Sequence, residues 1–281
     1  MKTLYESLLN INDVEASVDP IAMTIMKIDD WCKDNIRGNY VIDKKTLAIN
    51  SSASITITNR ELIEFPSYIH FGTVRINFYC DNCTSLKSLE GAPKKVGKNF
   101  SCTNCTSLES LEGAPKEVGR TFSCKFCTSL KSLEGCPEKV GEDFSCDNCR
   151  SLKSLEGAPK EVGGSFNCSE CDSLESLEGA PEKVGKSFYC LSCTSLKSLE
   201  GAPKEVGEGF SCTNCTSLKS LEGAPKEVGR DFYCTNCTSL KSLEGAPKEV
   251  GRDFYCGRCD SLTSLEGAPT HIGGEIYSDI K

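Results

Sequence analysis

One pattern of apolar and polar positions dominates the chain and repeats every 22 residues from residue 78 onward, without insertions. Most copies read F-x-C-x-x-C-x-S-L-x-S-L-E-G-A-P-x-x-V-G-x-x. The cysteine pairs that mark the copies are Cys80/Cys83, Cys102/Cys105, Cys124/Cys127, Cys146/Cys149, Cys168/Cys171, Cys190/Cys193, Cys212/Cys215, Cys234/Cys237 and Cys256/Cys259. A period of this length is typical of solenoids, propellers and arrays. The unit is too short for a propeller blade or a helix pair, so it predicts one strand followed by a return segment.

Within the unit, the alternation of Phe100 and Cys102 with variable residues is typical of a strand with one buried face. The later leucines, the alanine and Val118 then supply apolar contacts on the return segment. Gly113 and Gly119 stand where tight turns need a positive φ. The sequence therefore predicts a stack of short coils, each with a single buried strand.

This pattern resembles a leucine-rich repeat, with the phenylalanine and first cysteine on the strand and the second cysteine at that family's Asn/Cys ladder position. The return L-x-S-L-E-G-A-P is similar to the arc of short bacterial effector repeats, and C-x-S-L-x-S-L is similar to BspA-like repeats. The resemblance covers about residues 78–281. It implies an α/β solenoid with a parallel β-sheet on its concave side. The chain also resembles cysteine-rich repeat proteins of bacteria and their phages, which implies a bacterial or phage origin.

Residues 1–77 lack the repeat and predict an α/β cap over residues 1–54, followed by the solenoid over residues 55–281. Asp19 and Pro20 form a helix start, and Gly38 forms a stop. Between them one apolar stripe contains Ile21, Ile25, Ile28 and Cys32. Strands are predicted around residues 40–42, 47–49 and 54–58, and Ile55 and Ile57 resemble the Phe/Cys strand pair. The solenoid then holds nine C-x-x-C units at 80–275 and partial terminal units.

The last residues begin a tenth unit, with Ile276 in the phenylalanine position and Ser278 in the cysteine position. Residues 275–281 predict an open edge strand. Such an edge exposes unpaired backbone groups, so end-to-end self-association is an additional expectation.

The cysteines admit three interpretations. Buried cysteine packs as a small hydrophobe, and Cys136 already replaces an alanine in one unit. The spacing C-x2-C-x18-C-x2-C also fits a four-cysteine zinc site, and C-x-x-C is a redox motif. Nine pairs cannot combine two by two into such zinc sites without leaving one over, so we favour structural thiols, with no cofactor and no bound metal. A zinc-binding or thiol-redox protein stays open as the alternative.

Variation between the copies concentrates at the outward strand positions, whereas the return segment hardly changes. The resemblance places these positions on the concave sheet, and we predict that this concave face binds a protein partner, because tyrosine and arginine are enriched in binding hot spots. The predicted partner-binding residues are Tyr189, Tyr233, Tyr255, Arg230, Arg252, Arg258, Phe126 and Leu191. The competing interpretation is that tyrosine and Arg–Asp ladders only stabilise neighbouring strands.

Composition narrows the function further. There are 32 Lys and Arg against 40 Asp and Glu, a net charge of −8, which argues against a nucleic-acid or membrane-surface partner. The sequence starts without a secretory pattern and has no membrane-spanning run, so we expect a cytoplasmic protein. Because the chain has only two histidines, His70 and His271, most nucleophilic and general-base arrangements cannot be assembled. We therefore predict a non-enzymatic protein-binding scaffold without catalytic residues.

Overall fold

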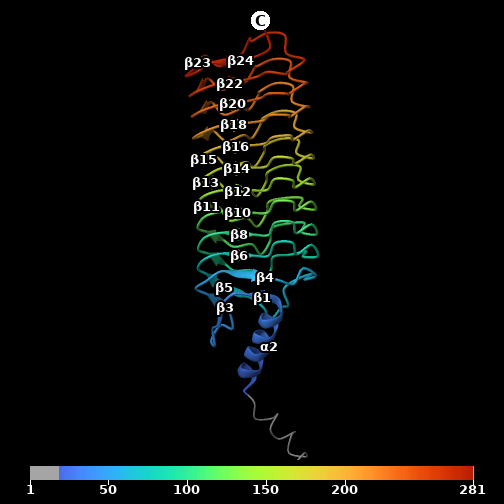
Figure 1. Cartoon of the computed structure of the whole chain (residues 1–281), viewed down its shortest axis with the longest axis vertical. Helices are drawn as coiled ribbons and strands as arrows, with labels where there is room; N and C mark the ends of the chain where they lie inside the picture. The colour runs from blue at the N-terminus through green and yellow to red at the C-terminus, as the bar shows by residue number, and fades with distance from the viewer. Residues whose placement is uncertain (1–18, 281) are drawn as a thin grey trace, which may run out of the picture.

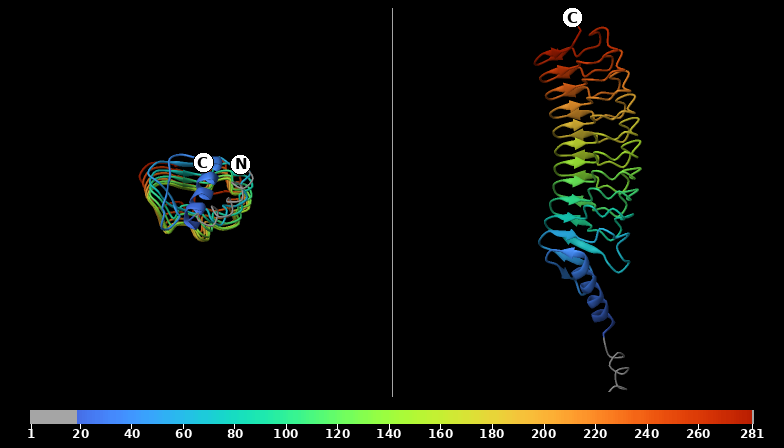
Figure 2. Two further views of the ribbon diagram at one scale, coloured as in Figure 1. Left: turned by 90° about the horizontal axis from the view of Figure 1, so that it is seen from below. Right: turned by 45° about the vertical axis from the view of Figure 1, so that its right-hand side comes forward.

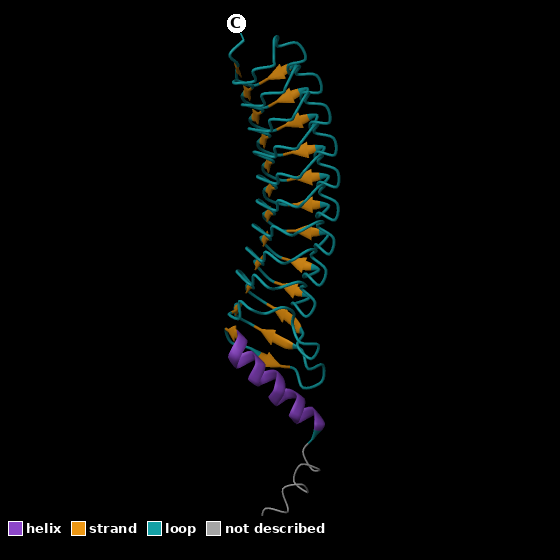
Figure 3. Ribbon diagram, turned by 90° about the vertical axis from the view of Figure 1, so that its right-hand side faces the viewer, coloured by secondary structure: helices purple, strands orange, loops and turns teal. Residues whose placement is uncertain are grey.

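Each 22-residue unit forms one coil of a solenoid, and the coils stack along a single axis (Figure 1). The computed structural model describes residues 19–280. Seen along the axis, successive coils superpose closely, so the cross-section stays nearly constant (Figure 2). The stack is only gently curved over its length (Figure 3). The predicted solenoid of stacked coils, with parallel strands and an N-terminal helix, is confirmed.

Every coil contributes one strand to each of two 12-stranded sheets. Sheet A consists of β1 (Ile36–Arg37), β4 (Ile55–Ile57), β6 (Phe78–Tyr79), β8 (Phe100–Ser101), β10 (Phe122–Ser123), β12 (Phe144–Ser145), β14 (Phe166–Asn167), β16 (Phe188–Tyr189), β18 (Phe210–Ser211), β20 (Phe232–Tyr233), β22 (Phe254–Tyr255) and β24 (Ile276–Tyr277). Sheet B consists of β2 (Val41–Ile42), β3 (Ile49–Ser51), β5 (Phe71–Val74), β7 (Lys95–Val96), β9 (Glu117–Val118), β11 (Lys139–Val140), β13 (Glu161–Val162), β15 (Lys183–Val184), β17 (Glu205–Val206), β19 (Glu227–Val228), β21 (Glu249–Val250) and β23 (His271–Ile272).

Sheet B corrects the prediction of a single strand in each coil. Val118, expected on the return arc, lies in β9 and pairs in register with Val96 and Val140. In each Lys/Glu–Val strand the charged residue is exposed and the valine is buried. A strand of two residues is too short to show an alternating pattern in the sequence, which is why it was missed.

The two glycines of each return segment have different roles. Gly113 has a φ of +85°, as predicted for a tight turn. Gly119 does not have a positive φ, so that part of the prediction is wrong. A Cβ at Gly119 would lie 2.1 Å from the carbonyl oxygen of Gly97, so glycine is required there by the close approach of successive coils.

Helix α2 (Pro20–Asn35) covers the N-terminal end of the stack, and the part of the predicted cap before residue 19 lies outside the described residues. Asp19 caps it by accepting the Ile21 N–H at 3.0 Å, as predicted. The helix ends before Gly38, because the chain turns directly into β1, which pairs antiparallel with β4. The predicted domain boundary at residue 54 lies between β3 and β4, the two strands of the first coil.

The core is built from columns of identical residues. The phenylalanines from Phe78 to Phe254 stack with ring centroids 5.0–5.9 Å apart. Ile55 pairs with Phe78 at one end and Ile276 pairs with Phe254 at the other, as predicted. None of the helices within residues 19–280 is long and apolar enough to span a membrane.

Candidate functional site

The paired cysteines are buried and act as hydrogen-bond donors to the backbone. The second cysteine of every pair donates its thiol to a carbonyl of the preceding coil at 3.1–3.5 Å, as Cys105 does to Cys80. Most first cysteines donate to the following coil, as Cys168 does to the carbonyl of Tyr189 at 3.4 Å. A thiolate cannot donate, so this network requires protonated thiols.

The electrostatic environment favours the same protonation state. Burial, followed by contact with the Cys193 thiol, raises the pKa of Cys168 well above its ordinary value. Burial also raises the pKa of Cys234 well above that value, and that of Cys259, near the end of the column, to about 12. Metal ligands and redox nucleophiles are thiolates with lowered pKa values, so this environment favours the structural interpretation. In residues 19–280 no group of three or more Cys, His, Asp or Glu side chains is arranged to hold a metal ion.

The outer face of sheet A carries the predicted tyrosines. Tyr233 and Tyr255 occupy equivalent positions of β20 and β22, and their rings stack with centroids 4.6 Å apart. Tyr277 of β24 continues the stack at 4.7 Å and is 45% exposed. The sequence prediction omitted Tyr277, although its place after Ile276 in the partial tenth unit was a sufficient signal.

Two of the predicted arginines flank this stack. Arg230 lies 3.5 Å from Glu208, and Arg252 lies 3.9 Å from Asp231. Both arginine side chains are more than half exposed. Such long surface pairs contribute little to stability, so either guanidinium can bind a new carboxylate at small cost.

The aspartates beside the tyrosines have a structural role. Asp231 accepts the backbone N–H of Asp253 at 3.2 Å, and Asp253 accepts that of Glu275 at 2.9 Å. Asn77 and Ser165 make the equivalent bond in other coils. Asp253 also accepts the Tyr255 hydroxyl at 3.2 Å, and burial together with this bond raises the pKa of Tyr255 to about 12.

The remaining apolar candidates lie further along the same face. Tyr189 is 37% exposed and is separated from Tyr233 by the coil of Ser211, which is buried. Leu191 is half-buried two residues after Tyr189. Phe126 lies three coils before them and is 44% exposed. The predicted residues therefore form a row along sheet A and not a single compact patch.

Phe126 has the same left-handed backbone conformation as the equivalent residue of every other cysteine-bearing coil. It has a φ of 58°, at a position where Asn104 and Asn148 have φ values of 61° and 62°. Asparagine tolerates this left-handed conformation, whereas a bulky residue is strained there. The asparagine that recurs at this position is the one sign of the conformation in the sequence. Glu170, Ser192 and Arg258 adopt the same conformation at this position, so Phe126 differs from them by its large, exposed apolar side chain and not by its backbone.

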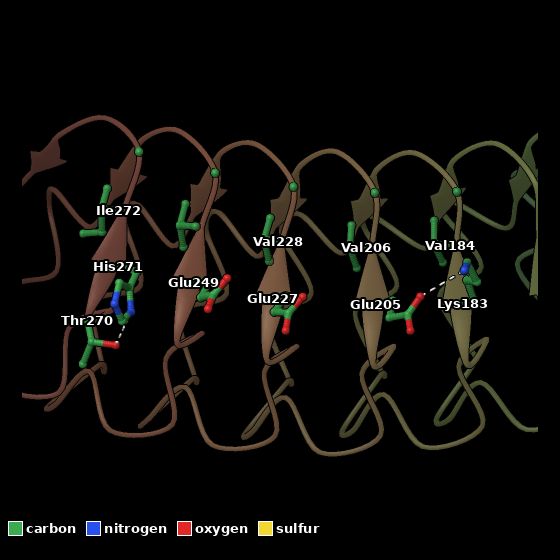
Figure 4. A pocket seen from close by; sticks show the side chains of 16 residues that line it. Lys183, Val184, Glu205, Val206, Glu227, Val228, Glu249, Thr270, His271 and Ile272 are labelled. Atoms are coloured by element: carbon green, nitrogen blue, oxygen red, sulfur yellow. Dashed lines mark hydrogen bonds and ion pairs between the residues drawn. The ribbon is translucent and has the colours of Figure 1, made fainter.

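Sheet B carries an open furrow of about 770 Å³ along β15, β17, β19, β21 and β23. Figure 4 shows Glu205, Glu227 and Glu249 along this furrow, with Lys183 at one end and His271 at the other. Lys183 pairs with Glu205 at 3.0 Å, but neither Glu227 nor Glu249 forms an ion pair within the described residues. The sequence did not predict this furrow, because it did not predict sheet B.

The predicted open edge strand is β24, which pairs with β22 (Phe254–Tyr255). Lys281 lies outside the described residues. End-to-end association through this strand stays a prediction.

Comparisons with known proteins add little to this description. No protein-family model and no curated protein matches the chain. Among solved structures, a leucine-rich repeat protein from Bacteroides ovatus ATCC 8483 is 15% identical, with a TM-score of 0.31, over 87% of this chain and 89% of that one. A similarity at that level carries no argument about function.

Proposed function

We propose that the protein is a non-enzymatic scaffold that binds a protein partner through the outer face of sheet A. The supporting observation is the replacement of small residues by large tyrosines on the outer face of the ladder, where Tyr189 is exposed and Tyr233 and Tyr255 are half-buried. The outward position after the phenylalanine is serine in coils such as those of Ser123 and Ser211, but tyrosine at Tyr189, Tyr233 and Tyr255. Large aromatic side chains on a preformed surface bury much area while losing little conformational freedom on binding.

The arginines and Phe126 extend this surface. Arg230 and Arg252 flank the tyrosine stack, and Arg258 follows Tyr255 by three residues. All three supply charged donors for carboxylates of the partner. Phe126 with Tyr189 and Leu191 supplies apolar anchors at the N-terminal side of the row. The tyrosine stack also stabilises neighbouring strands, so the test must separate binding from folding.

The double substitution Tyr233→Ser with Tyr255→Ser separates an effect on binding from an effect on folding. Serine occupies the equivalent position in four other coils, at Ser101, Ser123, Ser145 and Ser211, so the variant should fold. We expect it to lose at least about tenfold in partner affinity, because each hot-spot residue contributes about 2 kcal/mol or more. The measurement is quantitative affinity capture from extract, followed by titration of the captured protein.

The matched control is Glu227→Lys on sheet B. Lysine occupies the equivalent position at Lys95, Lys139 and Lys183, so this change also follows the repeat. Capture should survive it. Capture that survives the tyrosine substitutions, or that is lost equally in the control, would reject sheet A as the binding surface.

We also propose that the protein works in a reducing compartment, in keeping with a cytoplasmic location. All 20 cysteines are free, and 19 of them are buried, with Cys136 half-buried. Reduced thiols persist in the cytosol, whereas oxidising compartments favour disulfides.

A further inference from the structure

Two side-chain ladders on the outer face of sheet A stop in the same coil. Thr213 and Thr235 share a hydroxyl hydrogen bond of 3.1 Å, and the next residue in that column is Gly257. In the adjacent column Asn236 donates to Asn214 at 2.7 Å, and the next residue is Arg258. The sequence Thr-Asn of the preceding coil is thus replaced by Gly-Arg.

A hollow opens where these ladders stop. Two adjoining cavities of about 370 and 330 Å³ share Thr235, Gly257 and Asp279 in their linings. Asn236 and Arg258 line the first, and Tyr255 and Tyr277 line the second. Pockets of about 300 Å³ and more hold small molecules, so the joint hollow has room for one or two sugar rings.

The backbone does not require glycine at this position. Gly257 has no positive φ, and the nearest atom to an added Cβ is an Asp279 carboxylate oxygen at 3.6 Å, an ordinary contact. This differs from Gly113 and Gly119, which satisfy the geometry of the fold. Gly257 therefore creates space and relieves no strain.

The side chains that line the hollow include both hydrogen-bond donors and hydrogen-bond acceptors. The Arg258 guanidinium and the Thr235 hydroxyl donate, and the Asp279 carboxylate accepts, including from the Arg258 backbone N–H at 2.5 Å. Within the described residues no side chain donates to the Asn236 carbonyl oxygen, because the ladder ends there. The tyrosine rings add apolar edges that suit the C–H groups of a ligand.

We infer that this hollow is a binding site for a neutral saccharide of one or two rings. Adjacent hydroxyls of a sugar both donate and accept, which matches this mixed set of groups. An anionic ligand would meet Asp279 and the nearby Asp253, whereas a cationic ligand would meet Arg258. The hollow shares Tyr255 and Arg258 with the proposed protein-binding surface. The inference itself rests on the vacancy at Gly257 and goes beyond that surface.

The test is saturation-transfer NMR with a panel of glucose, galactose, mannose, N-acetylglucosamine, maltose, cellobiose, lactose and chitobiose. The wild-type protein should show transfer to at least one of them. The double substitution Gly257→Thr with Arg258→Asn restores the Thr-Asn sequence of the preceding coil and fills the hollow. It should fold with an unchanged or higher thermal midpoint and bind the active sugar at least about tenfold more weakly.

The matched control is Ser169→Thr with Glu170→Asn, which introduces the same Thr-Asn pair four coils earlier. It should retain sugar binding. The inference is overturned if no sugar of the panel binds the wild-type protein. It is also overturned if binding survives the Gly257/Arg258 substitutions, or is lost equally in the control.

Discussion

Cysteine suits the core of this solenoid because one small side chain supplies both apolar bulk and a hydrogen-bond donor. Cys171 illustrates this, since it is fully buried and donates to the carbonyl of Cys146 at 3.3 Å. Without that donor the carbonyl would be buried with one fewer partner. The repeated thiol is therefore a structural element at the scale of a single residue.

We expect Cys171→Ala to lower the free energy of unfolding by about 2 kcal/mol, through the lost hydrogen bond and the small cavity. Urea unfolding followed by circular dichroism measures this. Cys136→Ala is the control, because alanine is found at this position in the other units. It should change stability by less than about 0.5 kcal/mol. Equal effects of the two substitutions would contradict the special role of the paired thiols.

Residue roles could be predicted from the sequence only where the repeat itself carried the signal. The burial of Phe100 and Cys102 followed from their alternation with variable residues. The left-handed conformation at Asn104 did not, because asparagine is also common in ordinary turns. The vacancy at Gly257 was equally hidden, since only the three-dimensional columns show which ladder it interrupts.

At the scale of the element, the close approach of successive coils sets the strictest requirement. A Cβ at Gly207 would lie 2.2 Å from the carbonyl oxygen of Gly185, and this atom belongs to backbone that cannot move alone. Gly209, two residues later, has no atom nearer than 3.4 Å to its added Cβ. The two glycines lie in one coil, but only Gly207 lacks room for a Cβ.

We therefore expect Gly207→Ala to destabilise the protein by about 3 kcal/mol, because it forces two coils apart. Gly209→Ala should stay within about 0.5 kcal/mol of the wild-type protein. Thermal unfolding of both variants decides the matter. A well-tolerated alanine at Gly207 would show that sheet B does not hold the coils at this separation.

Only one of the two strands in each coil could be predicted from the sequence. Sheet A was signalled by the Phe-x-Cys alternation in every unit. Sheet B consists of two-residue strands such as β9, in which one charged and one apolar residue give no periodicity to detect. Its existence depends on pairing with neighbouring coils, which is a property of the stack and not of the local sequence.

At the scale of the whole molecule, the buried thiols make stability depend on alkaline pH. Their pKa values in the folded protein are raised above the ordinary value of 9.0 by burial, as for Cys190 and Cys234. Above about pH 9 the unfolded chain loses thiol protons that the folded chain keeps. Unfolding then becomes more favourable by about 1.4 kcal/mol per pH unit for each ionised thiol.

The stability that the protonated thiols contribute is accordingly fully present below about pH 8, and it is lost as the pH rises further. We expect the urea midpoint to fall steeply between pH 8.5 and about pH 10.5. The measurement is a series of urea titrations under reducing conditions. A midpoint that stays constant over this range would mean that the folded thiols ionise as readily as the unfolded ones.

The scaffold interpretation depends on thiols that are protonated and committed to the core, and one measurement tests this most directly. Free thiols are counted on freshly purified protein before and after denaturation, together with the bound metal. We predict almost no rapid reaction in the native state, 20 titratable thiols after denaturation, and near-zero metal. Several equivalents of zinc, or many thiols missing after denaturation, would contradict the structural role of the cysteines and would favour a metal-binding or redox function.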